Sequence, residues 1–101
     1  MARLSAEELR AALAGLPGWE EAGDAIEREF SFRTFRQAMA FANAVADIAH
    51  AARHHPDILI RYNRVRLTLS THDEGGVTEQ DIAFARAADA AQGQGQGQGQ
   101  A

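Results

Sequence analysis

Hydrophobic and polar residues alternate along two stretches of the chain, and this period of two predicts β-hairpins. Residues 25–32 place aliphatic and aromatic side chains on one face and mostly polar ones on the other. The shorter run at 19–22 precedes them across a turn at Gly23-Asp24. A second alternation covers 58–62 and 64–71. Each pair of runs predicts two antiparallel strands joined by a short turn.

Helical spacing marks three further segments. A capping box that begins at Ser5 predicts a helix over 6–14. A broad apolar face that follows Thr34 predicts a longer helix, which Pro56 ends. A face this wide indicates burial on more than one side. A third helix is expected to begin after Thr78.

The predicted element order is therefore α-β-β-α-β-β-α. Two hairpins separated by helices favour an α+β domain with one four-stranded antiparallel sheet and helices packed on one face. We assign this domain to residues 1–91. Residues 92–101 alternate Gln with Gly before a final Ala. They carry no apolar side chain larger than alanine, so they cannot offset the entropy of ordering, and we predict a disordered tail.

Composition narrows the classes of function. The net charge is −4 and arginine is the only strong base, so no basic nucleic-acid surface is expected. The chain has no cysteine, which excludes disulfides, thiolate nucleophiles and cysteine-ligated metals. No apolar run approaches the roughly 20 residues of a membrane span, and no apolar signal-peptide core follows the start. We expect a cytoplasmic protein that binds neither nucleic acid nor membrane.

Three of the four histidines lie in one short stretch, H-A-A-R-H-H-P-D, at residues 50–57. His50 and His54 have the spacing of the two zinc ligands in H-E-x-x-H, but the Glu that serves as general base there is absent. Arg53 between them would repel a cation. A metal site is therefore the less favoured interpretation, although His72 or the residue after it could complete a ligand set.

Acid–base chemistry fits the histidines better. Imidazole exchanges protons near neutral pH, and two segments that present three imidazoles could bracket a substrate. Cationic residues are also common at helix C-termini, where they only complement the helix dipole. For the pair His54–His55, these arguments leave catalysis and simple capping open.

A longer pattern carries a family resemblance. H-x-x-x-H-H-P-D, then Tyr62, then L-S-T-H-D-E-G-G-V-T-x-x-D, resembles the pterin-4a-carbinolamine dehydratases from about Ser5 to Asp89. The positions that match the family signature are His50, His54, His55, Pro56, Tyr62, His72 and Asp81. The first of these positions is often acidic in the family and is His50 here.

The resemblance implies an enzyme that removes water from 4a-hydroxytetrahydropterin to give quinonoid dihydropterin, in tetrahydrobiopterin recycling. It implies histidine acid–base catalysis without a metal or other cofactor. The residues implied to be catalytic are His54, His55 and His72. Those implied to bind the substrate are His50, Pro56, Ser70, Thr71, Asp73 and Glu74. Asp81 is expected to cap the third helix first, and secondly to hold the site residues in position without contacting the substrate.

The resemblance also implies a homodimer or homotetramer and a functional link to an aromatic amino acid hydroxylase. Some relatives serve as dimerisation cofactors for a transcription factor, and related folds act as assembly factors. A non-catalytic binding or assembly module on the same fold is therefore the alternative. The complete set of three histidines favours the enzyme, because a scaffold needs no such set.

Overall fold

The structure is a computed structural model that describes residues 2–99, with side chains described for residues 2–93. Its elements are α1 (Ala6–Ala14), β1 (Glu20–Ala22), β2 (Ala25–Ser31), α2 (Phe35–Ala52), β3 (Asp57–Arg61), β4 (Arg64–Leu69), the 3₁₀ turn η1 (His72–Glu74) and α3 (Glu79–Gly99). The predicted order α-β-β-α-β-β-α is confirmed. Among residues 2–99, no helix combines the length and apolar character that a membrane span requires.

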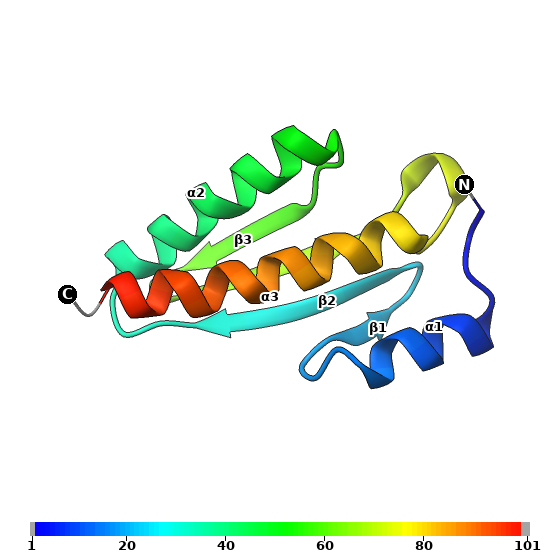
Figure 1. Ribbon diagram of the computed structural model, residues 1–101, viewed down its shortest axis with the longest axis horizontal. Helices are drawn as coiled ribbons and strands as arrows, with labels where there is room; N and C mark the ends of the chain where they lie inside the picture. Colours follow the sequence, from blue (N-terminus) through cyan, green and yellow to red (C-terminus); the bar gives the residue numbers. More distant parts are fainter. Residues whose placement is uncertain (1, 100–101) are drawn as a thin grey trace.

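The four strands form one antiparallel sheet in the order β1-β2-β4-β3. Helices α2 and α3 lie side by side over one face of this sheet (Figure 1). Helix α1 lies beside the short strand β1 at one edge (Figure 1). The predicted fold, with the helices on one face, is therefore confirmed.

The core lies between the covered face of the sheet and the helices. The register places Phe30 opposite Val65 and Ile26 opposite Leu69, and all four side chains are buried. Phe41 of α2 packs onto this layer with its ring centroid 4.6 Å from that of Phe30. Burial of each such side chain contributes about 1.5–3 kcal/mol. This layer therefore fixes where the helices sit on the sheet.

The predicted capping box at Ser5 is present. Ser5 Oγ accepts a hydrogen bond from the Glu8 backbone at 3.1 Å, and the Ser5 N–H donates to Glu8 Oε1 at 2.8 Å. The hydrogen bond from the Ser5 backbone holds the pKa of Glu8 below its usual value. Leu9, one residue further on, is buried and attaches α1 to the core.

Helix α2 ends earlier than the sequence predicted. The expected stop was Pro56, but the helix ends at Ala52 because Arg53 adopts a left-handed conformation with φ 54° and ψ 41°. The pair His54–His55 therefore lies in the connection to β3 and not on the last turn of the helix. A helix end of this kind depends on one residue in the left-handed conformation. That residue is usually Gly or Asn, so an arginine there gives no sequence signal.

Helix α2 packs against α3 on one side and against the sheet on another, as its broad apolar face predicted, although Phe35 at its start is 51% exposed. Tyr62, the last residue of the predicted strand 58–62, is 69% exposed. It occupies the turn between β3 and β4 with φ 52°. Both rings leave apolar surface on the outside of the isolated chain.

Helix α3 continues to Gly99, where the sequence predicted a disordered tail over 92–101. A residue added to an existing helix gains a hydrogen bond without a new nucleation cost, which allows a helix to extend beyond its packed part. Residues 100–101 lie outside the described residues.

A polar cluster joins α3 to β2 and to the segment before β1. Asp89 Oδ1 accepts hydrogen bonds from Trp19 Nε1 at 3.0 Å and from Arg28 Nη1 at 2.7 Å. The Arg28 guanidinium also lies 4.3 Å from the centroid of the Phe30 ring. The Asp89 carboxylate thus connects α3 to two segments more than 60 residues earlier in the chain.

The Asp89→Ala variant is expected to lose about 2 kcal/mol of unfolding free energy, because it leaves the Trp19 N–H without an acceptor and the partly buried Arg28 without its carboxylate, with only Gln92 Oε1 at 3.4 Å as a remaining acceptor. Asp89→Asn keeps an acceptor for Trp19 and is expected to lose less. Urea unfolding measures both, with Asp47→Ala, an exposed carboxylate on α2, as the control. A loss below about 0.5 kcal/mol for Asp89→Ala, the size of an ordinary surface substitution, would contradict this role.

Candidate functional site

An open cavity of about 260 Å³ lies where the α2–β3 connection meets the segment after β4. Its volume is close to the lower end of the roughly 300–1,000 Å³ that small-molecule sites span. The residues that line it are Arg53, His54, His55, Ser70, Thr71, His72, Asp73 and Gln80. The three histidines predicted to be catalytic therefore face one cavity, although they come from two segments.

Strand pairing explains why these two segments meet. In the antiparallel pair of β3 and β4, Asp57 at the start of β3 lies opposite Thr68 near the end of β4. The residues before β3 and those after β4 therefore emerge at the same end of the sheet. A bridge between Thr71 and Gly76 then closes the second segment into a tight loop that carries His72.

His54 is the buried member of the histidine pair. Its Nε2 lies 2.5 Å from Asp81 Oδ1, and the Asp81 side chain is fully buried. The His54 ring also packs edge-on against Phe84, with centroids 6.2 Å apart. Because an ionised carboxylate only accepts hydrogen bonds, Nε2 carries the shared hydrogen and the ring orientation is fixed.

Asp81 has further partners on its second oxygen. Oδ2 accepts hydrogen bonds from the Thr78 backbone N–H at 2.9 Å and from Thr71 Oγ1 at 2.8 Å. Thr78 Oγ1 lies 2.8 Å from Thr71 Oγ1 and accepts from the Gln80 N–H at 3.2 Å. Asp81 thus accepts a hydrogen bond from the free Thr78 N–H at the start of α3. It also holds two cavity residues, His54 and Thr71, in place.

His55 and His72 differ from His54 because both are exposed. They face the cavity from two different segments, the connection before β3 and the loop after β4. Within the part of the chain whose side chains are described, neither ring is held by a hydrogen bond from another side chain. Both rings are therefore available to a ligand, whereas His54 is held in position.

Other residues implied by the resemblance lie around this arrangement. Ser70, Thr71 and Asp73 line the cavity, while His50, Pro56 and Glu74 are not among the residues of its wall. His50 is exposed on the last turn of α2. It does not share a helix face with His54, because the helix ends between them. Within residues 2–93, no group of three or more His, Asp or Glu side chains is arranged to hold a metal ion.

The cavity wall includes two residues that the sequence did not identify as binding residues. Arg53 immediately precedes the histidine pair, and Gln80 lies in the first turn of α3 next to Asp81. The only sequence signal for Arg53 and Gln80 was that each lies next to a residue of the family signature. Their positions depend on the left-handed turn after α2 and on where α3 begins, which the pattern of residue types does not specify.

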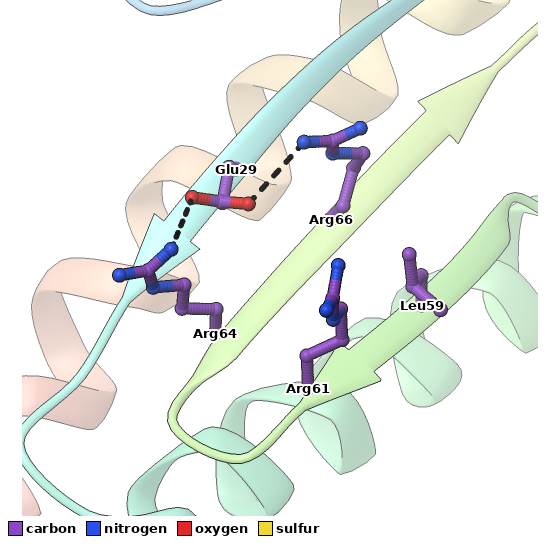
Figure 2. Close-up of a pocket in the computed structure, with 5 residues that line it drawn as sticks. All are labelled: Glu29, Leu59, Arg61, Arg64 and Arg66. Carbon is purple, nitrogen blue, oxygen red and sulfur yellow. Dashed lines mark hydrogen bonds and ion pairs between the residues drawn. The ribbon is translucent and has the colours of Figure 1, made fainter.

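A second hollow lies on the open face of the sheet and is much smaller, about 40 Å³. In Figure 2 the Glu29 carboxylate lies between two guanidinium groups, at 3.4 Å from Arg66 and 3.9 Å from Arg64. Arg61 and Leu59 of β3 complete the wall. This volume holds little more than a water molecule or two, so this hollow does not compete with the histidine cavity as a small-molecule site.

Comparisons with known proteins show which family this chain resembles. Residues 2–91 match a family model described as pterin 4 alpha carbinolamine dehydratase. A relative from Thermomicrobium roseum is 58% identical over 86 residues, which cover 85% of this chain and 92% of the relative. One from Chloroflexus aurantiacus is 52% identical over 93 residues, covering 92% and 100%. Both carry the name pterin-4-alpha-carbinolamine dehydratase as a provisional assignment.

Two solved structures share the fold. A Brucella melitensis protein described as a transcriptional coactivator/pterin dehydratase matches with a TM-score of 0.86 and 43% identity, covering 88% of this chain and 97% of that one. A pterin dehydratase-like protein described as a RuBisCO assembly factor in the alpha-carboxysome matches with a TM-score of 0.64 and 26% identity. That match covers 74% of this chain and 87% of the other.

Proposed function

We propose that the chain, which belongs to the pterin 4 alpha carbinolamine dehydratase family, is an active dehydratase of 4a-hydroxytetrahydropterin. The observation that carries the proposal is the meeting of His54, His55 and His72 at one cavity. Two segments separated along the chain supply these rings. A module that only binds a protein partner would not need three imidazoles facing a hollow.

The reaction needs two proton movements. The bond from C4a to its hydroxyl oxygen breaks as that oxygen receives a proton and leaves as water. The N5 proton is removed as the double bond between N5 and C4a forms, which gives quinonoid dihydropterin. The two steps together remove water from the pterin without oxidising or reducing it. One protonated and one neutral imidazole can perform both steps, because histidine gives and takes protons near neutral pH.

The contacts of the three rings support different roles. His54 is oriented by Asp81, so it can present the same ring edge to every substrate molecule. The exposed rings of His55 and His72 can approach the substrate from two different segments of the cavity wall. Ser70, Thr71 and Asp73 then supply polar groups for the edge of the pterin ring. Contacts from His50, Pro56 and Glu74 stay predictions from the resemblance.

The setting of the reaction is also part of the proposal. Quinonoid dihydropterin must be reduced before it can serve again, which supports a role in tetrahydrobiopterin recycling. The link to an aromatic amino acid hydroxylase and the location in the cytoplasm are further parts of the proposal. A homodimer or homotetramer is also part of the proposal. Exposed apolar side chains support it: Phe35, Leu59 and Tyr62 are each at least half exposed. Light scattering of the purified protein measures the oligomeric state.

A dehydration assay tests the proposed activity. Freshly made 4a-hydroxytetrahydropterin is mixed with the purified chain, and formation of the quinonoid product is followed by absorbance against the spontaneous rate in buffer. We expect a clear acceleration that is proportional to protein concentration. A rate equal to that of buffer alone would refute the proposal.

The alternative function is a binding or assembly module. The two solved structures support it, because one is described as a transcriptional coactivator as well as a pterin dehydratase and the other as an assembly factor. A partner protein that co-purifies with the chain and still functions with the His55→Ala variant would favour this module. Loss of dehydration in that same variant would show that both functions coexist.

A further inference from the structure

Arg53 adopts a backbone conformation that does not suit its side chain. Its φ of 54° and ψ of 41° lie in the left-handed region, which glycine enters freely and longer side chains rarely adopt. Its backbone N–H donates to the carbonyls of Ala49 and His50, and a glycine would make the same bonds. The helix end alone therefore favours glycine. A strained residue at a cavity indicates that its side chain has a function there.

The Arg53 side chain adds positive charge to the cavity wall. It is exposed and lines the cavity together with the three histidines. Among the described side chains, no carboxylate forms an ion pair with it. Among the residues whose side chains are described, Asp73 is the only acidic one that lines the cavity, and the buried Asp81 is occupied by His54, Thr71 and Thr78. The guanidinium is therefore free to bind a ligand.

Dehydration itself does not use this charge. The imidazoles carry the protons, and the reacting ring has no negative charge at neutral pH. A guanidinium presents a planar set of N–H donors that match a carboxylate or a phosphate. We propose that Arg53 makes the site selective for pterins whose side chain carries an anionic group, either a carboxylate or a phosphate ester. This inference rests on the proposed function, because it specifies the substrate class of the same cavity.

Stable oxidised pterins measure this selectivity directly. The probes are 6-hydroxymethylpterin, which has a neutral side chain, pterin-6-carboxylate, and the monophosphate ester of 6-hydroxymethylpterin. Calorimetric or fluorescence titration gives the dissociation constant of each. We expect the wild-type chain to bind at least one anionic probe about tenfold more tightly than the neutral one. The probe with the larger ratio identifies carboxylate or phosphate as the preferred group. The ratio should fall between about 20 mM and about 300 mM NaCl, because salt screens exposed charges.

Variants of Arg53 separate charge from backbone strain. Arg53→Gln and Arg53→Gly both remove the charge, and the ratio of anionic to neutral affinity is expected to fall to about 1. Arg53→Lys keeps the charge without the planar donors and should give an intermediate ratio. Arg53→Gly should also melt at a higher temperature than the wild type, which shows that its lost selectivity is not lost folding. Arg86→Gln, an exposed arginine of α3 outside the cavity wall, is the control and should keep the wild-type ratio.

The outcomes distinguish this inference from the function it rests on. Equal affinities of the wild-type chain for all three probes, together with normal dehydration of a neutral substrate, would overturn the selectivity and leave the dehydratase in place. An anionic preference that survives in Arg53→Gln would show that another group is responsible, and would also overturn the inference. No pterin binding and no dehydration would overturn both.

Discussion

Dehydration by the His72→Ala variant is expected to be slower than by the wild type by a factor of about 10²–10⁴, the usual contribution of a positioned general acid or base. His72 faces the cavity from the loop after β4, and His55 faces it from the connection before β3. Its side chain is exposed, so its loss should change the free energy of unfolding by less than about 0.5 kcal/mol. Activity and stability are therefore expected to separate in this variant. Stopped-flow absorbance measures the first, and urea unfolding the second.

His50→Ala is the comparison for this prediction. His50 is also an exposed histidine, but it lies on α2 outside the cavity wall. Its loss is expected to slow dehydration by less than about tenfold, below the contribution of a positioned proton donor or acceptor. Equal effects of His50→Ala and His72→Ala would show that proximity to the cavity wall does not decide which histidine acts. A wild-type rate for His72→Ala would remove it from the reaction.

Most of the fold could be predicted because local signals and tertiary structure agree. Ser5 and Glu8 satisfy each other's backbone groups, so the start of α1 is determined within four residues. The alternation around Phe30 matches the sheet because one face of that sheet is covered and the other is open. The end of α2 is different. It depends on the left-handed turn at Arg53, a residue type that does not signal one.

The candidate site likewise has features that the sequence predicts and features that it does not. The family signature identified His54, His55 and His72, and the structure places all three on one cavity. The signature could not distinguish the buried ring of His54 from the exposed rings of His55 and His72. That difference arises because His54 turns inward to Asp81, which lies 27 residues further along the chain. Contacts between distant segments of this kind leave no periodic trace in a single sequence.

Replacement of Asp81 by asparagine is expected to lower kcat by about 10²-fold or more, because it reverses the hydrogen bond that orients His54. The carboxylate accepts from the Thr78 N–H and Thr71 Oγ1 on one oxygen and from His54 on the other. Asparagine has a single acceptor oxygen, and the two donors at Thr78 and Thr71 will hold it. Its NH₂ group then faces Nε2 of His54. That nitrogen must now accept, so the ring hydrogen moves to the other nitrogen.

Stability distinguishes this effect from simple damage. Asp81→Asn keeps the shape and the bonds to Thr78 and Thr71, so we expect a loss of about 1 kcal/mol. Asp81→Ala leaves two buried donors, His54 Nε2 and the Thr78 N–H, without their acceptor, and should cost about 3 kcal/mol. Thr71 Oγ1 keeps Thr78 Oγ1 as a partner. Glu79→Gln, an exposed carboxylate in the same first turn of α3, is the control and should change neither quantity. Kinetics and urea unfolding on the four proteins give both measurements.

The rate of Asp81→Asn therefore decides the role of His54. If kcat falls while the fold is kept, the reaction depends on which nitrogen of His54 carries the hydrogen, and His54 takes part in proton transfer. If kcat stays within about twofold of the wild type, the orientation imposed by Asp81 is irrelevant to dehydration. His54 would then be a structural residue that closes the base of the cavity, and the two exposed rings of His55 and His72 would have to supply both proton movements.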